Sequence, residues 1–76
     1  MKIVYQSAAR KALKRLPKNL ALRIVTAIDK LPQGDVTRLK GRDDYRLRVG
    51  EWRVIFERDG ETISVTAIAP RGGVYR

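Results

Sequence analysis

The chain has 76 residues, and its 17 lysines and arginines against 8 acidic residues give a formal net charge of +9, with no histidine. A chain of this length forms one domain, residues 1–76, with room for a single apolar layer. Such a charge favours an anionic partner, which is nucleic acid, an acidic protein or a membrane surface. Because cysteine is absent as well, disulfides, thiolate chemistry and the usual zinc ligands are excluded.

The N-terminus and the apolar segments indicate where the protein works. The apolar run in Met1-Lys2-Ile3-Val4-Tyr5 is too short for a signal peptide. No apolar run approaches the roughly 20 residues that span a bilayer. We therefore expect a soluble, cytoplasmic protein that does not act at a membrane and needs no metal or other cofactor.

The first half of the chain predicts a short strand and then two amphipathic helices. Residues 2–6 alternate as in a strand, and Ser7 is a good N-cap for a helix over 8–16, which Pro17 ends. A second helix is expected over 19–31, before a Pro-Gln-Gly sequence. Both helices place apolar residues on one side at helical spacing, so they should pair as a hairpin.

The polar side of the first helix is strongly basic. It carries Arg10, Lys11, Lys14 and Arg15. Such a face could hold ribosomal RNA by its phosphates, and a simply solvated face is an equally good interpretation.

The second half predicts a three-stranded meander over 45–49, 52–56 and 63–67, after a polar connection that could hold a short strand near 36–39. Gly50-Glu51 and Asp59-Gly60 are candidate two-residue turns, since such turns need residues that tolerate positive φ. The predicted fold is α+β, with two layers in the order β-α-α-β-β-β. The helix hairpin packs on a small, mainly antiparallel sheet.

Two-residue turns fix the register of the meander. On the first hairpin Val49 faces Trp52, Leu47 faces Val54 and Tyr45 faces Phe56. On the second hairpin Phe56 faces Ile63, Val54 faces Val65 and Trp52 faces Ala67. Every inward position is then apolar, so Trp52, Tyr45 and Phe56 are expected in the core.

The outward positions of the meander gather arginines. In this register Arg48 faces Arg53, Arg46 faces Ile55, and Arg53 faces Thr66 on its other side. Like charges opposed across strands cost stability, at about 0.2–1 kcal/mol for a pair. A bound phosphodiester would supply the missing negative charge, and the planar guanidinium binds two phosphate oxygens at once. The simpler alternative is a solvated basic face.

Several motifs of the second half follow one another in a particular order: Leu39-Lys40-Gly41, then Tyr45-Arg46-Leu47-Arg48-Val49, then Trp52-Arg53-Val54-Ile55-Phe56, and finally Ile68-Ala69-Pro70-Arg71-Gly72-Gly73-Val74-Tyr75. With the element order, they resemble the RelE/ParE superfamily of bacterial and archaeal toxins, and the RelE branch in particular. The resemblance covers the whole chain in layout, and its specific part is this second half.

The resemblance implies a toxin of a type II toxin–antitoxin system. It would cleave mRNA in the ribosomal aminoacyl site, beside the 16S ribosomal RNA of the decoding site, and so arrest translation and growth. A cognate acidic antitoxin would silence it in a toxin–antitoxin complex. The implied chemistry needs no metal, because the ribose 2′-hydroxyl attacks the adjacent phosphate and leaves a cyclic phosphate.

Site residues carry over one by one within this resemblance. Arg53 matches the arginine that stabilises the transition state, and Arg71 matches the arginine near the scissile phosphate and leaving group. Tyr75 matches the tyrosine that orients the substrate near the 2′-hydroxyl. Arg46 and Arg48 stand where well-known members have lysines. Arginine stays protonated, so both can hold phosphate, Arg48 in the catalytic group and Arg46 in substrate binding, but neither can act as a general base.

Two candidates for the general base remain. Tyr75 has an unperturbed pKa of about 10, which nearby guanidinium groups would lower. Lys40, otherwise expected to bind substrate, is the second. We favour Tyr75, for which the alternative is packing on the sheet edge; a solvated loop cation is the simpler interpretation of Lys40.

Two other functions fit the same scaffold. A ParE-like toxin would trap DNA gyrase without cleaving RNA, and a plain RNA-binding module or decayed toxin would do neither. The outward arginines and the Arg-to-Tyr tail favour the nuclease, because a gyrase binder has no need of them.

Overall fold

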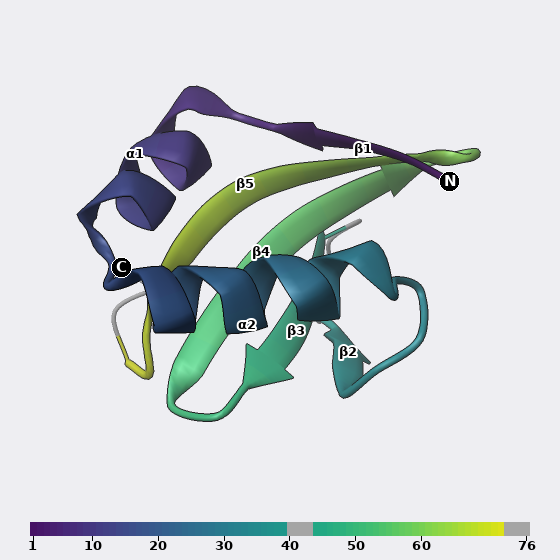
Figure 1. Ribbon diagram of the computed structural model, residues 1–76. Coiled ribbons are helices and arrows are strands. Elements are labelled where there is room, and N and C mark those ends of the chain that lie inside the picture. The colour runs from purple at the N-terminus through teal and green to yellow at the C-terminus, as the bar shows by residue number, and fades with distance from the viewer. Residues whose placement is uncertain (40–43, 73–76) are drawn as a thin grey trace.

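The computed structural model describes residues 1–39 and 44–72 (Figure 1). Two helices lie on one face of a five-stranded sheet whose strand order is β1-β5-β4-β3-β2. β1 runs parallel to β5, and the other neighbours are antiparallel. The elements are β1 (Lys2–Tyr5), α1 (Ser7–Arg15), α2 (Lys18–Asp29), β2 (Val36–Arg38), β3 (Asp44–Val49), β4 (Trp52–Asp59) and β5 (Thr62–Pro70). The predicted α+β class, helix hairpin and short strand near 36–39 are confirmed.

The start of α1 differs from the prediction. Ser7 is the first helical residue, and Gln6 holds the N-cap position with an extended backbone and no side-chain cap. The predicted N-cap at Ser7 is therefore wrong. The Gln6 side chain instead donates from Nε2 to Oγ of Ser64 at 2.7 Å, which ties the start of α1 to β5.

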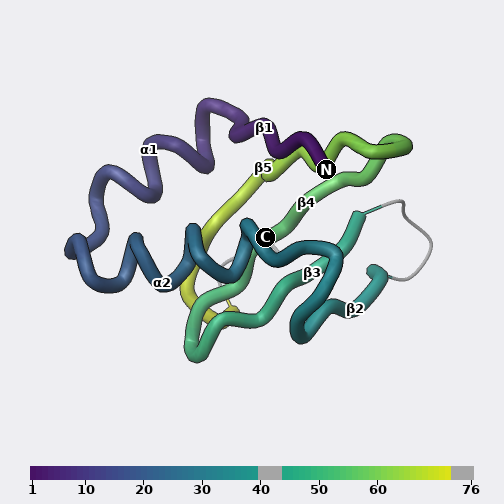
Figure 2. Tube along the Cα trace, turned by 45° about the vertical axis from the view of Figure 1, so that its right-hand side comes forward, coloured from purple at the N-terminus to yellow at the C-terminus, as the bar shows by residue number. Residues whose placement is uncertain are grey.

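The core lies between the helices and one face of the sheet. From the helices, Ala9, Ile24 and Ile28 are completely buried. From the strands come Leu47, Val54, Phe56, Ile63, Val65 and Ile68. Figure 2 shows both helices crossing the same face, with β1 and β2 at opposite edges of the sheet. The apolar faces given by the helical and the strand periodicity therefore meet in one core layer.

The aromatic residues of the meander pack against this core, as predicted. Trp52 and Tyr45 are partly buried against it. The Tyr45 and Phe56 rings stack across β3 and β4, with centroids 5.3 Å apart and an interplanar angle of 15°. None of the three is a free platform for stacking a nucleobase.

The first meander hairpin has the predicted register, and the second does not. Val49 pairs with Trp52, and Tyr45 pairs with Phe56. β4, however, continues to Asp59, which pairs with Thr62, so Phe56 faces Val65 rather than Ile63. The reason is the turn, where Gly60 has φ of 60° and occupies the first loop position instead of the second.

A β-bulge shifts the register further. Phe56 pairs with Val65 while Ile55 pairs with Ala67, which leaves Thr66 as the extra residue. The Thr66 hydroxyl donates to the carbonyl oxygen of Ile55 at 3.2 Å. The bulge reverses the side-chain alternation of β5, so Ile68 faces the core where Ala67 was predicted. The other predicted partners change too, with Val54 facing Ile68, Arg53 facing Ala69 and Trp52 facing Pro70.

Neither described helix combines the length and the apolar character needed to cross a membrane.

Candidate active site

Three arginines share the sheet face that points away from the helices. Arg48 pairs directly with Arg53 across β3 and β4, and Arg46 pairs with Ile55, as predicted. Their neighbours Leu47 and Val54 are buried in the core, so alternation places the arginines on the opposite face. We call Arg46, Arg48 and Arg53 the arginine face.

Arg53 is folded onto the molecule rather than extended into solvent. Only 9% of its surface is exposed. Its Nη1 donates to the carbonyl oxygens of Gly50 at 2.9 Å and Trp52 at 3.0 Å. Burying a charged group is costly unless hydrogen bonds compensate, and these carbonyls do so. They also fix the guanidinium group in one orientation, as a site that holds a phosphate needs.

The turn between β3 and β4 brings further arginines close. The backbone carbonyl oxygen of Glu51 accepts a 2.8 Å hydrogen bond from the backbone N–H of Arg71, which follows β5. On the other side of the turn, a methyl group built on Gly50 would lie 3.3 Å from Nη2 of Arg23. The turn therefore gathers the guanidinium of Arg53, the guanidinium of Arg23 and the backbone of Arg71. The Arg71 side chain is exposed. Sequence reasoning missed Arg23, because it lies on α2 and nothing in the sequence indicates that this helix brings it beside the turn.

Arg48 already has an anionic partner. Its Nε lies 2.6 Å from Oδ2 of Asp35, and the two side chains are 59% and 51% exposed. The Arg48 backbone N–H also donates to the carbonyl oxygen of Asp35 at 3.0 Å. Sequence reasoning missed this pair, although the register contains it: Val36 pairs with Leu47, which places Asp35 opposite Arg48. Part of the negative charge expected from a bound phosphodiester thus comes from the chain itself.

The structure describes some of the remaining predicted site residues and leaves others outside the described ranges. Arg46 is half-buried and lies between Thr37 on β2 and Ile55 on β4. Lys40 and Tyr75 lie outside the described residues, and with them both candidates for the general base. Geometry therefore brings Arg46, Arg48 and Arg53 together, and places the Arg71 backbone at the turn that holds the Arg53 guanidinium.

Tyr5 is a further titratable residue, which the sequence did not single out. Its hydroxyl is buried and has no hydrogen-bond partner within the described ranges. Burial, and secondly the nearby Asp29 carboxylate, raise the pKa of Tyr5 above its usual 10.0. A raised pKa disfavours a general base, and Tyr5 packs against the core, on the other side of the sheet from the arginine face.

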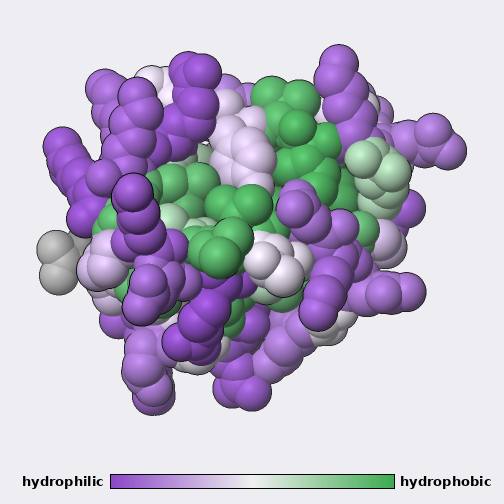
Figure 3. Space-filling model, viewed as in Figure 1, coloured by the Kyte–Doolittle hydropathy of each residue, from purple (hydrophilic) through white to green (hydrophobic). Residues whose placement is uncertain are grey.

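A groove of about 450 Å³ runs between α2 and β3 on the helix side. Leu47, Val49 and Ala27 contribute apolar surface to it, and Arg23 and Lys30 contribute cations. Arg48 and its partner Asp35 also line the groove, because the Arg48 side chain reaches Asp35 at the edge of the sheet. Leu22 also lines it and is 68% exposed. Figure 3 shows apolar surface in the middle of this side of the molecule, surrounded by hydrophilic side chains. The groove therefore combines an apolar lining with a rim of three cations and one carboxylate, which is positive on balance.

Two kinds of comparison with known proteins found matches. The family model of the ParE toxin of type II toxin–antitoxin systems (parDE) matches residues 3–75. The fold is similar to a chain of the RelB–RelE antitoxin–toxin complex of Methanococcus jannaschii, with a TM-score of 0.78, 26% identity, and coverage of 95% of this chain and 94% of that one.

Two other solved structures have the same fold. A chain of the archaeal RelE–RelB complex of Pyrococcus horikoshii OT3 matches with a TM-score of 0.78, 28% identity, and coverage of 95% and 96%. The YoeB/ParE toxin of Agrobacterium tumefaciens gives a TM-score of 0.74 and 19% identity over 93% and 99% of the two chains. No functionally curated protein sequence matches the chain.

Proposed function

The chain belongs to the ParE toxin family of type II toxin–antitoxin systems, and we propose that it acts by cleaving mRNA on the ribosome. One observation supports this activity above the others. Arg46, Arg48 and Arg53 share one sheet face, and the turn that holds the Arg53 guanidinium also binds the Arg71 backbone. Convergent guanidinium groups are what a reacting phosphodiester requires.

The proposed step is an internal transfer at one phosphodiester. The ribose 2′-oxygen bonds to the adjacent phosphorus while the bond from phosphorus to the 5′-oxygen breaks. The 2′-hydroxyl loses its proton to a base, and the 5′-oxygen gains a proton as it leaves, so the products are a 2′,3′-cyclic phosphate and a 5′-hydroxyl. The phosphate gains charge in the transition state, and fixed cationic donors stabilise that charge most.

Each arginine has a part in this step. Arg53, held by two carbonyls, stabilises the transition state at the phosphate oxygens without having to reorganise. Arg71 binds near the scissile phosphate and the leaving oxygen. Arg48 and Arg46 hold the phosphates on either side, and Arg48 exchanges its Asp35 partner for the substrate. Lys40 contributes to the same binding.

The base in this proposal is Tyr75, with Lys40 as the second candidate. Neither arginine on β3 can take a proton at neutral pH, since arginine stays charged. The ribosome supplies what the small site lacks, because it holds the mRNA in place and so removes much of the entropic cost of reaching the reactive geometry. We therefore expect little cleavage of free RNA, and activity in the cytoplasm, where ribosomes are.

A cleavage assay on ribosomes programmed with a short mRNA tests the proposal. The protein should cut at the vacant aminoacyl site, and Arg71→Ala should remove at least about two orders of magnitude of rate, as loss of one charge-stabilising donor does. Arg58→Ala is the matched control, because Arg58 is exposed and its Nε donates to the Gly60 carbonyl oxygen at 3.3 Å, away from the arginine face. Intact mRNA at high toxin concentration would refute the nuclease.

A second candidate function follows from the family itself. The matching family model is that of the ParE toxins, and a ParE-like protein would trap DNA gyrase by direct contact without cleaving RNA. In this case Arg53 and the Arg48–Asp35 pair stabilise the fold only. Gyrase–DNA cleavage complexes in the presence of intact mRNA identify this alternative, and RNA binding without growth arrest would identify a decayed toxin.

We propose that an acidic antitoxin is the partner in the resting state. The similar chains from Methanococcus jannaschii and Pyrococcus horikoshii come from complexes of RelE with RelB. Carboxylates laid over the arginine face would relieve its like-charge repulsion and block the substrate. The groove beside α2 suits the same partner, because acidic and apolar side chains on one segment match its positive rim and apolar lining.

A further inference from the structure

We propose that α1 carries a second RNA-binding surface, which contacts the phosphates of folded RNA while the arginine face holds the single-stranded message. The surface consists of Arg10, Lys11, Lys14 and Arg15 and is called the α1 ridge. The inference deepens the proposed function and rests on it, because the ribosome offers folded RNA on both sides of the message.

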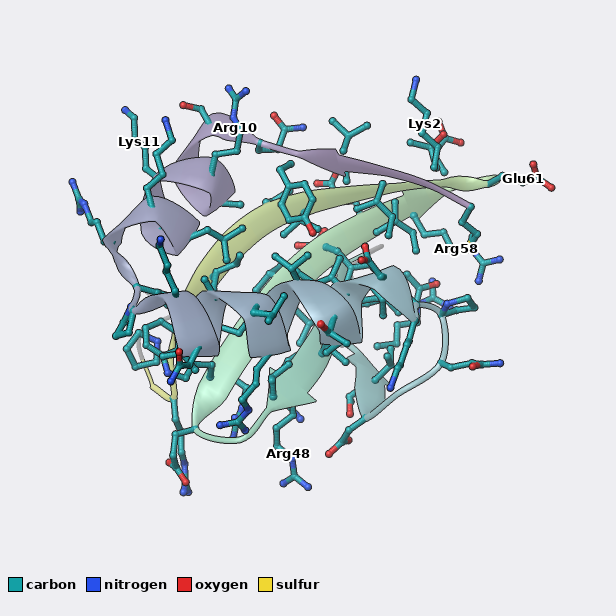
Figure 4. All side chains as sticks on the ribbon, in the orientation of Figure 1. Lys2, Arg10, Lys11, Arg48, Arg58 and Glu61 are labelled. Atoms are coloured by element: carbon teal, nitrogen blue, oxygen red, sulfur yellow. The ribbon has the colours of Figure 1, made fainter. Side chains whose placement is uncertain are left out.

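The geometry of α1 places these four cations on one face. At 3.6 residues per turn, they fall within an arc of about 140°. All four are exposed, while Ala9 on the opposite side is fully buried. In Figure 4, Arg10 and Lys11 project from α1 away from the sheet, at the far end of the molecule from Arg48. Figure 3 shows hydrophilic side chains crowded over this same helix.

No acidic side chain of the described residues neutralises the α1 ridge. None of its four side chains forms an ion pair with any residue of 1–39 or 44–72. The helix itself, SAARKALKR, contains no acidic residue. Arg10 lies four residues before Lys14, and Lys11 four residues before Arg15, and like charges at this spacing destabilise a helix.

The helix dipole explains only half of this arrangement. Lys14 and Arg15 lie in the last turn, where cations interact favourably with the free carbonyl groups. Arg10 and Lys11 lie earlier and gain nothing from it. A bound polyanion accounts for all four residues together, because it neutralises each of them.

The composition of the α1 ridge favours RNA backbone over unpaired bases. Proteins that bind single strands stack bases on aromatic side chains, and α1 has none. Lysine and arginine alone contact phosphates and sugars, which position a protein on a duplex without reading its sequence. The arginine face lies on the opposite side of the sheet from α1, so both surfaces are accessible at once.

A pair of double variants with equal charge tests the α1 ridge. Lys11→Gln with Arg15→Gln removes two cations of the ridge, and glutamine keeps helix propensity close to that of lysine and arginine. Lys2→Gln with Arg58→Gln removes two exposed cations elsewhere, on β1 and β4. The probe is a blunt RNA duplex, and fluorescence anisotropy gives its Kd over a series of salt concentrations.

We expect the ridge variant to bind the duplex at least about tenfold more weakly at low salt. The plot of log K against log salt should also become shallower, by about 0.9 for each phosphate that the variant no longer neutralises. The control variant should keep the wild-type slope. On programmed ribosomes the ridge variant should need more ribosome for half-maximal cleavage, with an unchanged rate at saturation. A thermal melt should show it to melt close to the wild type, because the relief of like-charge repulsion offsets the lost interaction of Arg15 with the helix dipole.

Equal duplex binding by the two variants would refute RNA binding by the α1 ridge while leaving the nuclease proposal intact. The same anisotropy measurement with labelled polyglutamate is the second arm of the test. If the ridge variant lost polyglutamate binding but kept duplex binding, the proposal would also be overturned, since the partner would then be an acidic protein. Absence of cleavage by the wild type refutes the nuclease instead, and in that case the duplex measurement still decides the α1 ridge.

Discussion

Arg48 and Asp35 form an ion pair at the edge of the arginine face, with 2.6 Å between Nε and Oδ2. Both side chains are more than half exposed, and pairs of this kind contribute only about 0–1 kcal/mol. The pair is therefore weak enough to open, and in the proposed reaction Asp35 would compete with the substrate phosphate for Arg48.

Replacing Asp35 should strengthen RNA binding. In Asp35→Asn, Arg48 loses its competitor, so we expect Kd for a short single-stranded RNA to fall by up to about fivefold at low salt, which corresponds to about 1 kcal/mol. Anisotropy measures this directly. Glu61→Gln removes the same charge from an exposed residue between β4 and β5 and is the control. An identical gain in both variants would show that net charge, and not Arg48, is responsible.

Arg53 should contribute to stability as well as to catalysis. Arg53→Ala removes two hydrogen bonds from a charged donor and leaves a gap beside the turn, so we expect the free energy of unfolding to fall by about 1.5–3 kcal/mol. Arg71→Ala, at an exposed side chain, should change it by less than about 0.5 kcal/mol. Urea denaturation separates the two. Equal stability of Arg53→Ala and the wild type would mean that the carbonyl contacts contribute nothing.

The fold could be predicted from this sequence further than the register could. Strand alternation and the glycine at position 50 were enough for the first hairpin, because both signals agree. The second hairpin was misjudged by two residues, since Gly60 provides positive φ at the first loop position as readily as at the second. The bulge at Thr66 has no sequence signature, and it moved Ile68 into the place predicted for Ala67.

The candidate site could be predicted in part for similar reasons. Alternation indicates which face of the sheet Arg53 lies on, but not how a long side chain bends along that face. Its burial against Gly50 and Trp52 therefore needed coordinates. The Asp35 partner of Arg48 needed only the pairing of the short β2 strand with β3. The roles of Tyr75 and Lys40 remain predictions.

Tyr5 should make the folded protein less stable at high pH. Burial and Asp29 raise its pKa in the folded protein, so between the unfolded and folded pKa values the unfolded chain loses the proton first. Fewer protons bound in the unfolded state mean that the free energy of unfolding falls as pH rises above about 10. Tyr5→Phe should lack this contribution and, at neutral pH, gain about 1 kcal/mol, because an unpaired buried hydroxyl is removed. Urea melts at about pH 8 and about pH 11 give the difference; parallel curves for the two proteins would contradict it.

The groove beside α2 should matter for the antitoxin and not for the fold. Leu22 is 68% exposed, so Leu22→Asp loses little burial but puts a carboxylate where an acidic, partly apolar segment would lie. We expect affinity for the co-expressed antitoxin to fall by at least about tenfold, since the substitution removes both the apolar packing and the charge match. Calorimetry with the purified partner measures it. Ala8→Asp, at an exposed position of α1 outside the groove, should bind as tightly as the wild type. If Leu22→Asp also binds normally, the antitoxin lies elsewhere, and the arginine face is the surface it covers.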